Sequence, residues 1–221
     1  MPFSEENIAD LRSVSLEGED IKIKLNHAVD VILDKAREAF TTDGQVVIPL
    51  VEINKPFGHG LLAGHFVAIG GYFKNPASLK RTGDVVIAKE GNSVSLQVAL
   101  GLAVAEAGFD SYNLDLLNIH QSGKIHVQIA ENSLSMKVSL FYAPRCSFKL
   151  DYVMFDRLGG IKVDITGLGA FQNLFNTLSK WLIDNFQDNL KAAVNKVLYD
   201  KLEKVIMKNK LCEKIQKIIS N

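Results

Sequence analysis

One stretch of the chain, SVSLQVALGLAVAEAGF at Ser93–Phe109, places a large apolar side chain at every second position. Alternation with a period of two is typical of a β-strand that has one apolar face. The alternation continues from Val94 to Val104, which predicts a single strand well beyond the usual length of about 5–6 residues. Such a strand presents a long apolar face, and an element of comparable length must cover it.

The element that can cover this face lies near the C-terminus. The chain contains neither proline nor glycine between Gly169 and Met207, which predicts one helix of roughly forty residues. At about 1.5 Å per residue, this helix extends about 55–60 Å, a length that matches the predicted strand. The helix therefore accounts for the burial of the apolar strand face.

Within this helix, large apolar residues recur at every fourth position. Four residues turn about 400°, so the apolar stripe winds around the helix axis. A twisted sheet that wraps the helix can follow such a stripe, whereas a coiled coil requires a repeat of about 3.5 residues. The stripe consists of Leu174, Leu178, Leu182, Phe186, Leu190, Val194, Leu198 and Leu202.

A second helix is predicted near the N-terminus, because apolar residues from Leu25 to Phe40 recur three and four positions apart behind a possible cap at Asp20. Between the two helices, strand-like alternation is interrupted by turns such as Gly159-Gly160, which indicates an antiparallel meander. The alternation changes parity after Ile129, which predicts a bulge or turn within Ala130–Ser133.

The predicted fold class is therefore α+β. A long curved antiparallel sheet is rolled around a long C-terminal helix, and a second helix lies near the N-terminus. The expected organisation is an N-terminal arm at residues 1–19, one domain at residues 20–207 and a basic C-terminal tail at residues 208–221, which continues or follows the long helix.

Charge and hydropathy exclude several classes of partner. The formal net charge is zero, so the composition gives no general attraction to nucleic acid. No stretch approaches the ~20 apolar residues that span a bilayer, and stable membrane insertion is not expected. The start of the chain lacks the apolar core of a signal peptide, which leaves a cytosolic protein or a mature secreted form. Lysines are concentrated after Lys191, where they form a solvated helix face or a contact for an anionic surface.

The sequence carries no recognisable catalytic motif, and no enzyme activity, metal or cofactor is expected. His120 and His126 would lie far apart on one strand or on opposite sheet faces, so they cannot chelate a metal together. His59 and His65 occur in a glycine-containing segment, where surface positions explain them better than a metal does. A Gly-X-Ser-X-Gly elbow is absent.

Cys146 and Cys212 are the only two cysteines, too few for a structural zinc site or a disulfide framework. They form either two buried thiols or one bridge.

Two segments and the order of the elements resemble the mite group 7 allergens. The segments are LNHAVD at residues 25–30 and LKRTGD at residues 79–84, and the resemblance covers roughly residues 20–205. It implies a secreted arthropod protein with a tubular lipid-binding fold, as a single-half super-roll. That fold is similar to the juvenile-hormone-binding and takeout proteins and to one half of the bactericidal/permeability-increasing and lipopolysaccharide-binding proteins. In the bactericidal relatives, a disulfide ties a strand to the terminal helix. Cys146 and Cys212 occupy similar places, which favours a bridge.

The resemblance further implies that a hydrophobic or amphipathic lipid-like ligand binds between sheet and helix, with IgE as a partner if the protein is an allergen. The walls of the site are expected to be apolar, since burial of each methylene contributes about 0.8 kcal/mol without any motif. The residues predicted to line it are Val98, Leu100, Leu102, Leu178, Leu182 and Phe186.

Three alternatives remain open at this point. Sheet and helix can close on a dry core without a cavity. The protein can instead recognise bacterial lipid products at its tips, where lysines would meet phosphates and no ligand would enter the interior. It can also bind a partner protein through the lysine-rich tail at Lys208–Asn221.

Overall fold

The computed structural model describes residues 19–42, 47–60, 63–90, 93–116, 119–141 and 146–208. The predicted arm before Glu19 and the tail beyond Lys208, which includes Cys212, lie outside these ranges. The helices are α2 (Glu19–Thr42) and α3 (Phe175–Lys208), and the short 3-10 helices are η2 (Pro76–Ser78) and η3 (Gly169–Leu174). The strands are β1 (Val47–Leu50), β2 (Ile53–Phe57), β3 (Gly64–Lys74), β4 (Leu79–Arg81), β5 (Val86–Glu90), β6 (Ser93–Leu102), β7 (Glu106–Leu116), β8 (Ile119–Phe141) and β9 (Ser147–Ile165).

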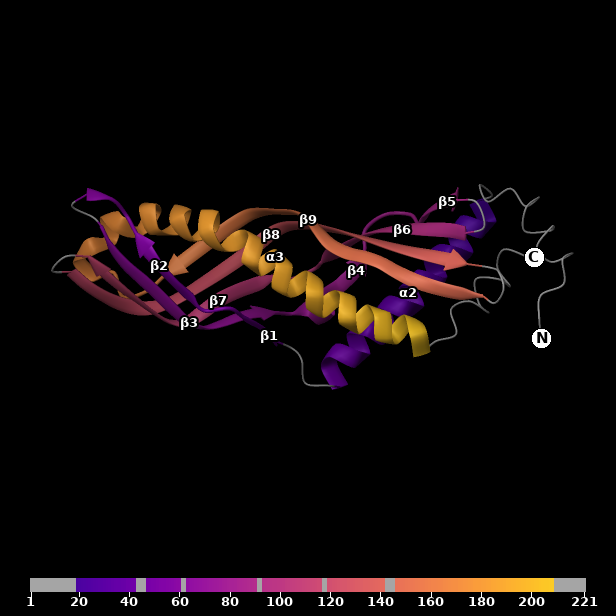
Figure 1. Cartoon of the computed structure of the whole chain (residues 1–221), viewed down its shortest axis with the longest axis horizontal. Helices are drawn as coiled ribbons and strands as arrows, with labels where there is room; N and C mark the ends of the chain where they lie inside the picture. The colour runs from indigo at the N-terminus through magenta and orange to yellow at the C-terminus, as the bar shows by residue number, and fades with distance from the viewer. Residues whose placement is uncertain are drawn as a thin grey trace, which may run out of the picture.

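The strands of the described part of the chain form one antiparallel sheet with nine members. Its central order is β1-β3-β7-β8-β6-β4, while β2 pairs with β3, β5 with β6 and β9 with β8. Figure 1 shows an elongated molecule in which α3 runs along the sheet, and α2 lies beside the C-terminal half of α3. The predicted α+β class, with a long antiparallel sheet, a long C-terminal helix and an N-terminal helix, is confirmed.

The prediction of one uninterrupted long strand is wrong, because the chain leaves strand conformation at residues 103–105 and divides into β6 and β7. Both strands nevertheless run along the same neighbour, β8. Leu100 of β6 pairs with Leu134 of β8, and Glu106 of β7 pairs with Gln128 of β8. Between these two pairs the chain advances by six residues on each side, so the register along β8 does not slip. The apolar face therefore continues along β8 across a short interruption.

At this interruption the buried apolar side chains change from even-numbered to odd-numbered positions. Val104 was predicted to face the core, but its side chain is 48% exposed, and Ala105 is buried instead. Strand β8 changes parity at the same level, because Ile129 and Leu134 are both buried. The bulge or turn predicted within Ala130–Ser133 does not break β8; a shift in the β8–β9 register falls at the end of that range.

The side chain of Asn132 bridges the two strands where both change parity. Its amide nitrogen donates to the backbone oxygen of Leu102 at 2.9 Å, and its amide oxygen accepts from the Leu102 nitrogen at 2.6 Å. The Asn132 side chain thus substitutes for the backbone pairing that a regular ladder would provide.

We expect Asn132→Ala to lower the free energy of unfolding by about 2–3 kcal/mol, because it leaves the N–H and C=O groups of Leu102 without partners. Urea denaturation measures this loss. Asn113→Ala, at an exposed position of β7, is the matched control and should change stability by no more than about 0.5 kcal/mol. Equal stability of the two variants would contradict the bridging role of Asn132.

The apolar stripe of the C-terminal helix packs as predicted, although the helix starts later. Residues Gly169–Leu174 form η3, and the α-helix itself begins at Phe175. The buried positions are Leu174, Leu178, Leu182, Phe186, Leu190, Val194, Leu198 and Leu202. Every fourth residue is therefore in the core, as a winding stripe under a twisted sheet requires.

The two segments that resemble the group 7 allergens contact each other. The first lies in α2, and the second comprises β4 and the residues that lead to β5. Arg81 donates from two nitrogens to the carboxylate of Asp30, at 2.9 and 3.0 Å. Asn26 accepts from the backbone nitrogen of Val85 at 2.9 Å and donates to Asp84 at 2.9 Å. A bidentate arginine–carboxylate pair has a defined geometry, so these contacts fix α2 against the sheet.

Candidate functional site

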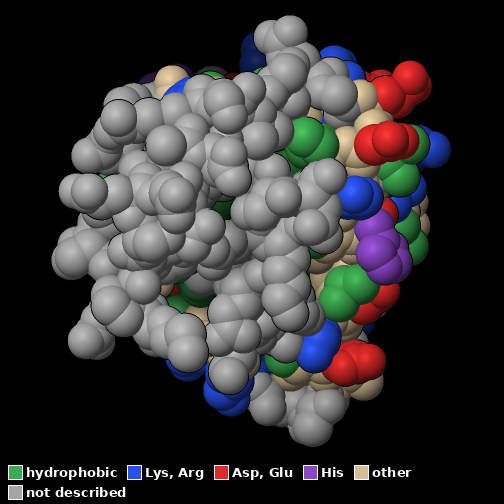
Figure 2. Space-filling model, turned by 90° about the vertical axis from the view of Figure 1, so that its right-hand side faces the viewer, with side chains coloured by type: hydrophobic (Ala, Val, Ile, Leu, Met, Phe, Trp, Pro, Cys, Tyr) green, Lys and Arg blue, Asp and Glu red, His purple; other side chains and the backbone are tan. Residues whose placement is uncertain are grey.

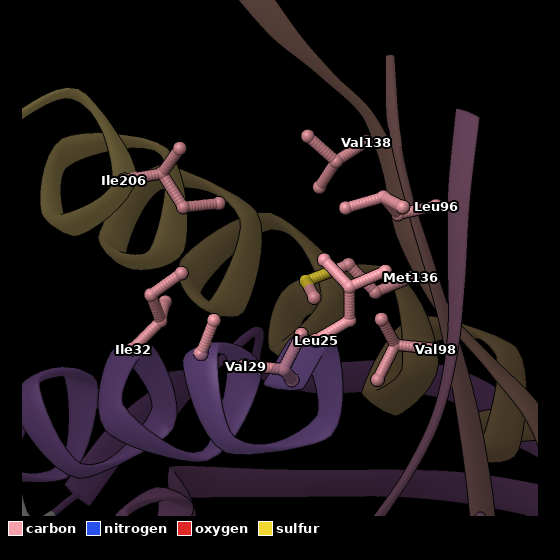
Figure 3. A pocket seen from close by; sticks show the side chains of 9 residues that line it. Leu25, Val29, Ile32, Leu96, Val98, Met136, Val138 and Ile206 are labelled. Atoms are coloured by element: carbon pink, nitrogen blue, oxygen red, sulfur yellow. The ribbon is translucent and has the colours of Figure 1, made fainter. Parts of the chain in front are cut away.

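A small apolar hollow lies beneath α2, between this helix, the sheet and the C-terminal end of α3. We call it the α2 void. Figure 3 shows that side chains from α2, β6, β8 and α3 converge on it. Its volume is about 20 Å³, room for about one water molecule. Its lining is wholly apolar: Leu25, Ala28, Val29, Ile32, Leu96, Val98, Met136, Val138 and Ile206.

A second hollow lies between α3 and the surface formed by β7, β8 and β9. We call it the α3 groove; its volume is about 40 Å³. The rings of Phe109 and Phe186 meet edge to face in it, with centroids 4.9 Å apart. Ile161, Ile183 and Gln187 are only half-buried, so the groove reaches the molecular surface. Its lining residues are Phe109, Ile125, Val127, Ile129, Leu158, Ile161, Val163, Leu182, Ile183, Phe186, Gln187 and Leu190.

The position of the α3 groove follows from how α3 is attached to β9. In the described sheet, β9 pairs only with β8, and its other edge faces α3. The backbone nitrogen of Phe155 donates to Asn195 at 2.9 Å, and the Tyr199 hydroxyl donates to the backbone oxygen of Leu150 at 2.8 Å. Both bonds anchor the C-terminal half of α3. The groove lies beside its N-terminal half.

The protonation state of Tyr199 favours this attachment. Burial, and then the nearby carboxylate of Glu203, raise the pKa of the Tyr199 hydroxyl above its usual value. Since an unshifted tyrosine is already protonated at neutral pH, the raised pKa only extends the pH range in which the hydroxyl donates to the edge of β9.

The six residues predicted to line one ligand site do not converge on a single hollow. Val98 lines the α2 void, whereas Leu182 and Phe186 line the α3 groove. Leu100, Leu102 and Leu178 are buried in the core and line neither hollow. Whether any of the six contacts a ligand stays a prediction.

The sequence reasoning missed the sheet side of the groove, which Ile125, Leu158 and Val163 help to form. The alternating residues of β8 were visible in the sequence, but only the strand pairing shows that they face α3 together with β9. Gln187 was missed as well, since one glutamine in an amphipathic helix carries no distinguishing signal.

Three of the four candidate histidines, His65, His120 and His126, make local contacts. His120 Nδ1 lies 2.6 Å from a carboxylate oxygen of Asp115, and His126 Nδ1 lies 3.5 Å from the Tyr72 hydroxyl. His65 Nε2 lies 2.5 Å from the amide oxygen of Asn54. Within residues 19–208, the described positions include no group of three or more metal-ligating side chains.

Cys146 is disulfide-bonded. Cys212 lies outside the described residues, so the pairing between the two cysteines stays a prediction.

Figure 2 views the molecule end-on, from the right-hand side of Figure 1. Its described side chains form a mixture of acidic, basic and apolar groups, and basic groups do not gather there into one continuous area. None of the described helices is both long enough and apolar enough to cross a bilayer.

Comparison with known proteins gives a match to a family model and likenesses to solved structures. The sequence model of the family described as Group 7 allergen matches residues 24–211. No curated protein sequence matches the chain. Among solved structures, the chain is similar to the crystal structure of Takeout 1 from Epiphyas postvittana, at 13% identity and a TM-score of 0.36. That likeness covers 82% of this chain and 88% of the other.

Proposed function

The chain belongs to the group 7 allergen family, and from this premise we propose that it binds a hydrophobic or amphipathic lipid-like molecule between the sheet and α3. The observation that carries the proposal is the α3 groove, whose walls are almost entirely aliphatic and aromatic and which reaches the surface. Apolar walls of this kind provide few hydrogen-bond partners for a polar substrate, but they can bury an alkyl chain.

The groove is narrow, because its volume of about 40 Å³ holds only a few water molecules. Binding of a long chain therefore requires α3 and β9 to separate along the groove. The bonds of Asn195 and Tyr199 to β9 lie in the other half of the helix and need not break. In the groove's half, Trp181 packs against Phe57 of β2 and Phe66 of β3. Burial of about ten methylenes gives roughly 8 kcal/mol before ordering costs, the scale of a micromolar complex.

Leu182 and Phe186 are the predicted lining residues that this site retains, and Val98 would contact a ligand only if it extended into the α2 void. We further propose that the protein acts outside the cell as a carrier rather than as an enzyme. The disulfide at Cys146 supports an oxidising compartment, where such bonds persist. IgE recognition would follow from membership of an allergen family and remains part of the proposal.

The test is displacement of a fluorescent apolar probe, together with native mass spectrometry of the purified protein. We expect saturable probe uptake that changes little with ionic strength, since the groove has no charged lining residue. Affinity that falls steeply with added salt would instead indicate recognition of lipid phosphates at charged surfaces. Absence of both probe uptake and bound mass would contradict the proposed function.

A further inference from the structure

The α3 groove contains one polar side chain, and this side chain limits which amphiphiles can fit. Gln187 is the only polar residue among those that line it, and none of its lining residues is charged. The glutamine amide offers two donors and an acceptor. We propose that the groove selects single-chain lipids with a neutral hydrogen-bonding head, such as long-chain alcohols or esters, and that Gln187 binds this head. This inference rests on the proposed function and specifies its ligand class.

The position of Gln187 suits the head of an amphiphile whose chain lies in the groove. Gln187 is half-buried, while its neighbour Phe186 is buried against Phe109. The head would therefore bind close to solvent, and the chain would extend inward along the apolar walls. Ile183 and Leu190, one turn away on either side, give apolar contacts next to the head.

A second polar group on the same side of α3 supports a ligand that carries oxygen. Ser179 lies one turn before Ile183, and about 12 Å along the helix from Gln187. Its hydroxyl oxygen is buried and has no hydrogen-bond partner in the described part of the chain. A buried polar atom without a partner requires an explanation. Ser179 is not among the residues that line the groove, so an oxygen of a bound lipid would reach it only if the ligand extended beyond the groove toward the start of α3.

The lining also disfavours an ionised head. At the half-buried position of Gln187 the head loses part of its hydration, and this partial loss costs more for a carboxylate without a partner cation than for a hydroxyl or an ester. Lys191, one turn beyond Gln187, is not among the lining residues. A fatty alcohol should therefore bind more tightly than the fatty acid of equal chain length.

The experiment compares decanol with decanoate as competitors for bound phenylnaphthylamine, at a pH of about 8, where the acid is ionised. On the full-length protein, we expect decanol to displace the probe at about tenfold lower concentration than decanoate. Gln187→Leu should weaken decanol binding about five- to tenfold relative to the variant's own binding of the apolar probe. Gln97→Leu, at an exposed position of β6 outside the groove, is the matched control and should leave both unchanged.

Stronger or equal binding of decanoate would overturn the inference, and loss of decanoate binding in Lys191→Gln would then identify the cation responsible. Unchanged decanol affinity in Gln187→Leu would overturn it as well. If the probe, decanol and decanoate all bind without preference for a head group, the inference is overturned while the proposed function stays intact. A protein that takes up no probe would overturn both.

Discussion

Replacing Leu198 by alanine is expected to lower the free energy of unfolding by about 3–5 kcal/mol. The Leu198 side chain is 0% exposed and lies in the half of α3 that is bonded to β9. A truncation there leaves a cavity that anchored neighbours cannot fill, because Asn195 and Tyr199 fix the adjoining helix to β9. Urea denaturation followed by circular dichroism measures the loss.

Two control variants test whether the loss of stability depends on burial and on the position along α3. Lys196→Ala, at an exposed position two residues away, should change stability by no more than about 0.5 kcal/mol. Leu190→Ala removes the same atoms at the edge of the α3 groove, where packing is already incomplete, and should cost only about 2–3 kcal/mol. If Leu190→Ala were the more costly variant, the C-terminal half of α3 would not be its anchored half.

Ile183→Asp should lower the affinity for an apolar probe by about tenfold or more. Ile183 is half-buried in the groove wall, so a carboxylate there stays hydrated while the groove is empty. When an alkyl chain covers this position, the charge loses its water without gaining a partner, which is costly. Fluorescence titration of the folded variant measures the change.

Val197→Asp is the matched control for this substitution, since Val197 is a half-buried apolar residue of the same helix that does not line the groove. Its probe affinity should stay within about twofold of wild type. Ile183→Asn carries no charge and should show an intermediate loss. Equal losses in the two aspartate variants would show that the probe responds to the stability of α3 rather than to the groove.

The sequence predicted the architecture well, because long periodic patterns leave few choices. The four-residue spacing from Leu174 to Leu202 winds around the helix, and the twisted sheet together with α2 buries every one of those side chains. The break between β6 and β7 could not be foreseen in the same way. The alternation runs on to Val104, but the strand partner supplies Asn132 at Leu102, and the buried face changes parity there.

The candidate site was less predictable than the fold. Alternation identifies which strand residues face inward, yet Val98 and Phe186 both face inward and line different hollows. Only the pairing of β8 with β9, and the attachment of α3 to the β9 edge, place a groove at one level of the helix. The two segments that resemble the group 7 allergens turned out to hold α2 in place through Asp30 and Arg81.

The proposed binding site is tested most directly by NMR of the methyl groups of leucine, isoleucine and valine during a titration with decanol. We expect the largest shift changes at methyl groups of the α3 groove, such as those of Leu158, Val163 and Ile183. Methyl groups exposed elsewhere, such as those of Val51 and Val86, should not move. Shift changes confined to these exposed positions, or none at any methyl group, would contradict binding between the sheet and α3.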